Sequence, residues 1–229
     1  MLEKITKFVL KKWVFITLIA IEICGFIALI WARIKQNSYP YRGVFIDNNF
    51  LDALAMNKFY EAIQEGLGLF VLFFLAAIVF YTIAFVKFKR GTFLPKDRGA
   101  LMGFFFFTAT AIAFMIPFIY DIKSRGSERP IVKVESVIDK RIDQYKSSTD
   151  YYIVFESKKT YKVTKSTYLS YHHGQKFYVV HQGKVIIAAL PMNSYVPKIP
   201  IKEVINGSVL KIYGENEVTF KPLESESEE

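Results

Sequence analysis

Three long apolar runs in the first half of the chain constrain its fold more than any other feature. They cover residues 13–31, 67–86 and 100–120. Each reaches the roughly 20 residues that an α-helix needs to cross the hydrocarbon core of a bilayer. The chain is also 52% hydrophobic and 17% aromatic, which is more than ordinary globular proteins contain. The sequence therefore predicts a multi-pass protein of the plasma or inner membrane with three transmembrane helices.

The lysines before the first run raise the question of a cleaved signal peptide. The apolar stretch after Lys11 and Lys12 is too long for the core of such a peptide, and no small-residue cleavage site ends it. Lipid attachment at Cys24 needs small residues before the cysteine, but Glu22 and Ile23 stand there. We expect the run to remain as a span and Cys24, the only cysteine, to be a buried apolar residue.

The net charge of +9 is concentrated near the ends of the apolar runs. Basic residues cluster before the first run and in the connector 87–99, and short segments rich in Lys and Arg usually face the cytoplasm. We therefore expect a cytoplasmic N-terminus and an extracytoplasmic C-terminal half. Such clusters touch anionic headgroups, so the lipid bilayer is an expected partner. Nucleic acid is not, because no aromatic-lined basic groove is indicated.

The loop between the first two runs contains a second helical pattern. Asp47 and Asn48 can cap a helix whose apolar residues recur at helical spacing, which predicts an amphipathic helix over about 48–65. This helix either lies on the membrane surface or leads straight into the second span. Two roles remain open for this helix: a connector that packs on its own neighbours, or a lid over a cavity in the membrane. With the spans, it completes a membrane region over residues 1–126.

Residue types change abruptly after residue 126, from apolar runs to short strand patterns separated by turns. Strands are predicted within residues 131–142, 151–156, 160–164, 176–181 and 185–190. They form a small β-barrel or sandwich over residues 127–196. A β meander over 197–223 follows, with a hairpin turn at Asn206-Gly207, and an acidic tail ends the chain at 224–229. The predicted fold class is an α+β membrane protein, with three transmembrane helices followed by a small all-β soluble domain.

The segment from Val134 to Leu190 has a recognisable order of elements. A first strand and a polar loop precede the YYIVFES and KTYKVTK hairpin, a corner at 166–170 and then HHGQKFYVV. This layout resembles that of uncharacterised bacterial membrane-anchored proteins in which helices precede a small β-barrel domain of unknown function. The resemblance covers about a quarter of the chain. It implies a bacterial membrane-tethered interaction or sensing module and assigns no role to individual residues.

Glu22 is the one acidic residue near the middle of an apolar run, nine residues from both Trp13 and Trp31. An ionisable group at this depth costs roughly 2.5–3.5 kcal/mol, so it usually faces a partner or a cavity. Thr108 and Thr110 of the third run lie at similar depth, and their hydroxyls can bond a protonated carboxyl. Glu22, Thr108 and Thr110 are therefore the intramembrane candidates. Three interpretations of Glu22 remain open. It forms a purely structural hydrogen bond, it lies on an ion or proton path, or its site is completed by another chain.

The β-domain offers a second set of candidates. Aromatic and basic side chains alternate along its strands, and a surface of this kind suits protein or anionic-ligand contact. The predicted binding face consists of Tyr151, Lys158, Lys159, Lys162, Lys165 and Tyr178. The adjacent His172 and His173 are expected at a solvated corner, and His181 is expected to be a surface or packing residue.

Familiar catalytic signatures are absent from the sequence, including GxSxG, the phosphate-binding loop, HExxH and GxGxxG. We therefore expect no enzyme, no catalytic residues, no cofactor and no metal site. The expected function is that of a membrane accessory protein. Its β-domain binds a protein or small ligand, and its spans associate with a membrane-protein partner or as a homo-oligomer. The alternatives are a small channel or transporter subunit whose oligomeric pore is lined by Glu22, and a ligand-sensing membrane effector.

Overall fold

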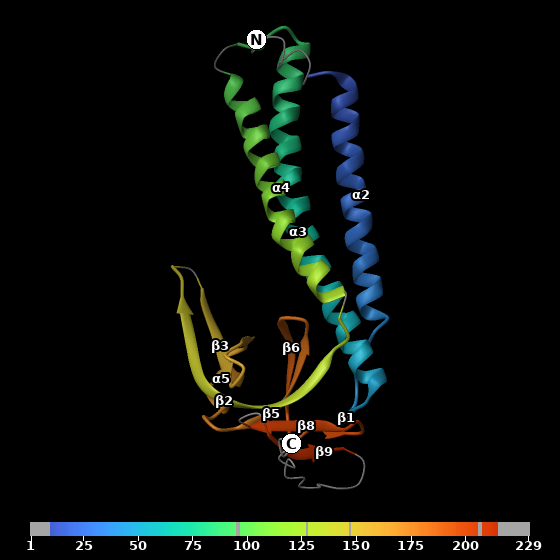
Figure 1. Cartoon of the computed structure of the whole chain (residues 1–229). Coiled ribbons are helices and arrows are strands. Elements are labelled where there is room, and N and C mark those ends of the chain that lie inside the picture. Colours follow the sequence, from blue (N-terminus) through green and yellow to red (C-terminus); the bar gives the residue numbers. More distant parts are fainter. Residues whose placement is uncertain (1–9, 95–96, 127, 147, 206–207, 215–229) are drawn as a thin grey trace, which may run out of the picture. The chain divides into compact units, whose positions relative to one another are not determined.

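A computed structural model describes residues 10–94, 97–126, 128–146, 148–205 and 208–214 of the chain. Contacts divide the chain into two compact units. The first comprises Met1–Ser38 and Phe59–Lys123, and the second comprises Tyr39–Lys58 and Ser124–Glu229. Long apolar helices form the first unit and strands dominate the second, so the fold is α+β as predicted (Figure 1).

The described chain contains three helices that are long and apolar enough to cross a membrane. They are α2 (Lys12–Asn37), α3 (Asn48–Lys89) and α4 (Arg98–Gly126). Each predicted run therefore forms a helix, and each helix extends beyond its run. Only 11% of the most apolar stretch of α2 and of α4 is buried inside the chain, so both helices present apolar side chains outward. A surface of this kind matches a lipid environment.

Aromatic and small side chains fill the interior of the helical unit. Tyr81 of α3 is fully buried, and its hydroxyl donates to the Lys11 carbonyl at 3.1 Å. Phe73 of α3 stacks on Phe114 of α4 with ring centroids 5.2 Å apart. The other buried apolar residues of this interior are Leu10, Leu18, Phe74, Ala77, Ala84, Leu101, Phe104 and Ala111.

One sequence expectation about α2 is wrong: Cys24 is exposed. The buried residues of α2 are Leu18, Glu22, Gly25 and Ala32. Their spacing of three, four and seven residues follows one helix face. Cys24 lies outside that face, so its side chain is on the outer surface of the helical unit.

Helix α3 begins in the second unit and continues without interruption as the second apolar span. Asp47 caps its first turn, because the Asp47 Oδ1 accepts a hydrogen bond from the Phe50 N–H at 2.8 Å. The predicted helix over 48–65 therefore exists and leads straight into the span. Its first turns are grouped with the strands, whereas the sequence placed them in the membrane region. They bury Phe50, Leu51 and Leu54 among β-domain residues.

The second unit contains a five-stranded antiparallel sheet in the order β4-β3-β2-β5-β6. Its strands are β2 (Ile131–Gln144), β3 (Thr149–Phe155), β4 (Thr160–Val163), β5 (Lys176–Gln182) and β6 (Val185–Pro191). Helix α5 (Lys165–Ser170) connects β4 to β5. The outer strands β4 and β6 approach each other, so the sheet is nearly closed. The five predicted strands and the barrel-like arrangement are confirmed.

Two small sheets accompany the main one. β1 (Phe45–Ile46) pairs in parallel with β7 (Val196–Pro197), which ties the segment before α3 to the end of the barrel. β8 (Ile201–Ile205) pairs with β9 (Ser208–Tyr213) as an antiparallel hairpin, as expected for the meander. The predicted turn residues Asn206 and Gly207, the end of the predicted meander after residue 214 and the acidic tail 224–229 lie outside the described residues.

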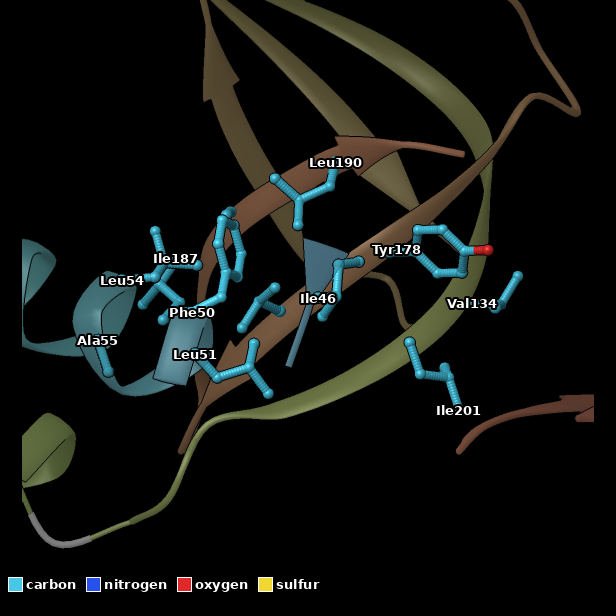
Figure 2. Close-up of a cluster of buried hydrophobic side chains, with 12 residues drawn as sticks. Ile46, Phe50, Leu51, Leu54, Ala55, Val134, Tyr178, Ile187, Leu190 and Ile201 are labelled. Atoms are coloured by element: carbon cyan, nitrogen blue, oxygen red, sulfur yellow. The ribbon is translucent and has the colours of Figure 1, made fainter. Parts of the chain in front are cut away.

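The curved sheet buries a separate apolar cluster on each face. We call one the inner cluster because its residues come from the strands that curve around it: Val137, Ile153, Phe155, Phe177, Val179 and Ile186. The outer cluster joins Val134, Tyr178, Ile187 and Leu190 of the sheet to Phe50, Leu51 and Leu54 of α3, with Ile46 and Ile201 beside them (Figure 2). Helix α3 therefore supplies part of the β-domain core.

Close helix contact at Gly66 gives a test of packing in the helical unit. A Cβ at this position would lie 2.2 Å from the Phe118 ring of α4, whereas a Cβ at Gly68 would meet nothing within 4 Å. We expect Gly66→Ala to destabilise the helical unit by about 1–3 kcal/mol through overpacking. Gly68→Ala should be neutral or slightly stabilising. Thermal unfolding of both variants in the same detergent measures the difference, and equal melting temperatures would contradict close packing of Phe118 on Gly66.

Candidate functional site

Strand β2 changes its pairing partner along its length, and this change creates the candidate site. Residues 131–136 of β2 pair with β5 on one edge, whereas residues 137–144 pair with β3 on the other. A register shift lies between Val137 and Asp139, which is typical of a β-bulge that bends a strand. On the β3 side, sheet pairing within the described chain starts only at Val137.

The backbone of Val132 and Val134 points to this open edge. The Ser136 carbonyl accepts a hydrogen bond from the Glu156 N–H at 3.2 Å on the β3 side, whereas the Val137 N–H donates to Gln175 on the β5 side. Backbone groups of successive strand residues alternate between the two edges. The N–H and C=O groups of Val132 and Val134 therefore share the edge of Ser136, where no strand of the described chain pairs with them.

A groove of about 600 Å³ runs along this edge. Consecutive residues 131–135 of β2 line it, so the groove follows the strand backbone and not one sheet face. Glu156 and Ser157 of the β3–β4 turn and Pro200 and Lys202 near the start of β8 complete the lining. Its size falls within the range of ordinary ligand sites. We call it the β2 groove.

A buried hydrogen-bonded pair, Glu135 and His181, closes the inner side of the β2 groove. Glu135 and His181 are 5% and 6% exposed, and the His181 Nε2 lies 2.6 Å from the Glu135 Oε1. The His181 Nδ1 lies 3.4 Å from the Lys159 Nζ. Because an ammonium can only donate, this contact favours the tautomer whose proton is on Nε2. The second carboxylate oxygen of Glu135 accepts from the Ser157 Oγ at 2.6 Å and from the Ser157 N–H at 3.3 Å.

These hydrogen bonds decide the charge of Glu135. Burial by itself would raise the pKa of this carboxyl. The hydrogen bonds from His181 and Ser157 outweigh burial, so the pKa lies below its ordinary value of 4.5. Glu135 is therefore ionised at neutral pH and anchors the β3–β4 turn against β2.

The chemistry of this cluster differs from that of a serine hydrolase. In a nucleophilic relay the histidine lies between the serine and the acid, whereas here Glu135 lies between Ser157 and His181. A carboxylate with a lowered pKa is a weak base for a serine hydroxyl. Among the described residues, no three His, Cys, Asp or Glu side chains are placed to hold a metal ion. The arrangement instead holds the β3–β4 turn beside the open edge of β2.

The six residues of the predicted binding face do not form one surface. Lys162 lies 2.8 Å from Asp150 in an ion pair. The Tyr151 ring packs against Tyr168 with centroids 5.1 Å apart. Lys158 occupies the β3–β4 turn with φ 59°, Lys165 begins α5, and Lys159 contacts His181. Only Lys158 and Lys159 belong to the turn that borders the β2 groove.

Two assignments in the β-domain need correction. Tyr178 is 3% exposed and belongs to the outer cluster, because its strand position faces α3 and β8 and not solvent. His181 is neither a surface residue nor a simple packing residue, since it pairs with buried Glu135. Sequence reasoning missed Glu135 altogether. An acidic residue inside the alternating apolar pattern of β2 was the available signal.

Within the helical unit, Glu22 is buried. It is 6% exposed, and neither of its carboxylate oxygens has a hydrogen-bond partner among the described residues. The Thr108 hydroxyl donates to the Phe104 carbonyl and the Thr110 hydroxyl donates to the Phe106 carbonyl of their own helix. The expected hydrogen bond from these threonines to Glu22 is therefore not formed.

Comparison of the chain with protein-family models, with curated proteins and with solved structures finds no match. The bacterial resemblance over Val134 to Leu190 therefore stays a prediction. Any functional assignment depends on the geometry of the site itself.

The Glu135 carboxylate predicts how the stability of the β-domain depends on pH. Its folded-state pKa lies below the ordinary value of 4.5, so its contribution is complete above about pH 4.5 and is lost as pH falls through the lower folded-state value. Glu135→Gln should lower the free energy of opening for β2 and β5 amides at pH 7 by about 1–3 kcal/mol. It should also reduce the further decrease of this free energy as the pH is lowered. Hydrogen exchange of the full chain in nanodiscs, corrected for intrinsic rates, measures both effects.

The matched control is Glu156→Gln, which removes an exposed acid from the same groove. It should leave the protection at pH 7 and its decrease in acid unchanged. If amide protection decreases equally with falling pH in wild type and in Glu135→Gln, the Glu135–His181 pair does not stabilise the β-domain.

Proposed function

We propose that this protein is a non-enzymatic membrane-anchored binding protein whose β-domain takes up an extended segment of a partner polypeptide along the β2 groove. The three apolar helices insert into the membrane and hold the β-domain at its surface. The observation that carries the proposal is the backbone edge of β2 at Val132 and Val134, with which no strand of the described chain pairs.

Backbone geometry favours a strand as the occupant of the β2 groove. An added strand receives hydrogen bonds from an open sheet edge, which is a common mode of peptide recognition. Edge strands in soluble proteins are normally blocked, charged or covered. Here the edge is bordered by the Ser157 turn and by Pro200, so it is accessible inside a groove and not along a flat rim.

Charge in the groove favours an acidic segment. Exposed Lys133 and Lys202 line it, and the Glu135 carboxylate already accepts hydrogen bonds from His181 and Ser157. Glu156 is the one other acidic residue among the described residues of the lining. Complementary charge raises the association rate and selects among partners. The expected ligand is an extended peptide with alternating acidic and apolar residues.

The position of Glu22 also supports binding over conduction. A pore shared between copies of the chain needs the carboxyl on the outside of the helical unit. Glu22 is instead on the buried face of α2, three residues before Gly25, which packs closely on Val71 of α3. This placement favours a site internal to one chain over an oligomeric pore.

The proposed orientation has a cytoplasmic N-terminus and an extracytoplasmic β-domain in the plasma or inner membrane. Ser170 is exposed at the end of α5, and Arg90 is exposed in the basic connector. We expect Ser170→Cys to react with a membrane-impermeant maleimide on intact cells and Arg90→Cys to react only after permeabilisation. The reverse pattern would invert the topology.

Strand addition predicts a specific effect of proline in β2. The Val132 N–H faces the open edge, so Val132→Pro removes one donor without breaking the pairing with β5. We expect the full chain in nanodiscs to bind a fluorescent Glu-Val-Glu-Val-Glu-Val-Glu peptide, and Val132→Pro to weaken this binding at least about tenfold. Fluorescence anisotropy measures affinity, and hydrogen exchange of β5 checks that the domain stays folded.

A charge-reversal pair provides the independent control. Lys133→Glu with Lys202→Glu keeps the backbone edge and should shift preference from the acidic peptide to a Lys-Val peptide of the same length. The same peptide methylated on alternate backbone nitrogens should bind poorly to every variant. Unchanged affinity in a folded Val132→Pro protein, or no saturable binding to the wild type, would refute strand addition.

A further inference from the structure

A second groove lies in the helical unit, between the start of α2 and the end of α3. It has a volume of about 550 Å³ and is lined by Lys12, Phe15, Ile16 and Ile19 of α2 and by Phe85 and Lys89 of α3. The walls are aromatic and aliphatic, and the charged groups stand at the helix termini, because Lys12 is the first residue of α2 and Lys89 the last of α3. We call it the α2–α3 groove.

Stacked rings give one wall of this groove a defined form. Phe15 and Phe85 stack with centroids 5.4 Å apart and an interplanar angle of 8°. Phe15 also stacks on buried Tyr81 at 5.8 Å. The Lys89 Nζ lies 5.9 Å from the centroid of the Phe85 ring. The stacked rings therefore fix the apolar wall to the interior of the helical unit, and the Lys89 ammonium group lies beside this wall.

The two lysines have no acidic partner among the described residues. The nearby acid of the connector, Asp97, is already used: Lys87 lies 2.5 Å from its Oδ1, and the Leu94 N–H donates to its Oδ2 at 2.9 Å. None of the described residues that line the groove is acidic. Lys12 and Lys89 are thus available to an external anion next to an apolar surface.

We propose that the α2–α3 groove binds an anionic glycerophospholipid of the surrounding leaflet. One acyl chain lies against Phe15, Ile16 and Ile19, and the headgroup phosphate is held by Lys12 and Lys89. The chemistry fits because the groove combines an apolar channel with two cations at its end, as expected at a membrane boundary. The inference rests on the proposed membrane insertion and is independent of peptide binding by the β2 groove.

A neutral lipid or an apolar helix suits the site less well. Either would cover the aromatic wall but leave two ammonium groups without a counter-charge. A soluble acidic ligand would satisfy the lysines but would not use the apolar wall. Only an anionic amphiphile uses both parts of the groove.

The test is lipid retention by the full chain. Protein reconstituted with equal amounts of phosphatidylglycerol and phosphatidylcholine is extracted in mild detergent, and retained lipids are identified by native mass spectrometry. Wild type should retain phosphatidylglycerol preferentially. Lys12→Gln with Lys89→Gln should reduce that retention by about fivefold per lysine.

Two further variants separate a built site from general attraction. Arg90→Gln with Arg98→Gln removes the same charge from exposed residues of the connector region outside the groove and should retain the lipid as wild type does. Ile16→Trp fills the groove from an exposed position and should release the lipid although both lysines remain.

Several outcomes would overturn the inference. These are equal loss in the Arg90/Arg98 control, full retention in Ile16→Trp, and equal retention of the two lipids by wild type. Co-flotation with vesicles is measured for every variant. If the chain fails to float at all, membrane insertion itself is wrong, and that result is distinct from insertion without lipid selectivity.

Discussion

The change of pairing partner along β2 is the constraint on which the β-domain depends. Because residues 131–136 pair with β5 and residues 137–144 pair with β3, one strand belongs to two differently oriented parts of the sheet. The bulge near Val137 bends it between them. This bend lets β4 approach β6 and encloses the inner cluster. It also leaves half of each β2 edge without a strand in the described chain, and the β2 groove follows one of these halves.

Helix α3 gives the β-domain a core that the C-terminal half of the chain does not contain by itself. Phe50, Leu51 and Leu54 cover the sheet face that carries Tyr178 and Leu190 (Figure 2). Burial of such side chains contributes roughly 1.5–3 kcal/mol each. The same helix continues as the second apolar span. One continuous helix therefore contributes residues both to the β-domain core and to the helical unit.

Glu135 and Glu22 are both buried, but their surroundings differ. Glu135 accepts hydrogen bonds from His181 and Ser157, and these bonds keep it ionised beside a groove. Glu22 has no partner among the described residues. An unsatisfied buried polar group costs free energy that a protein normally avoids. Glu135 thus holds the β3–β4 turn beside the open edge of β2, whereas Glu22 is a separate feature of the helical unit.

The sequence by itself determined the parts of this protein that depend on local pattern. Runs of about 20 apolar residues specify the three long helices, Asp47 specifies the start of α3, and alternating apolar residues specify the five strands. These features follow from hydrogen bonding and burial within a few turns or a single strand.

Only the tertiary structure decided which residues meet. It placed the first turns of α3 in the β-domain core, buried Tyr178, paired Glu135 with His181 and left Thr108 and Thr110 bonded to their own helix. It also opened the edge of β2, because strand register and bulges are set by contacts between segments far apart in the chain. A sequence pattern reports which face of an element is apolar, but the partner of that face is chosen by packing over long range.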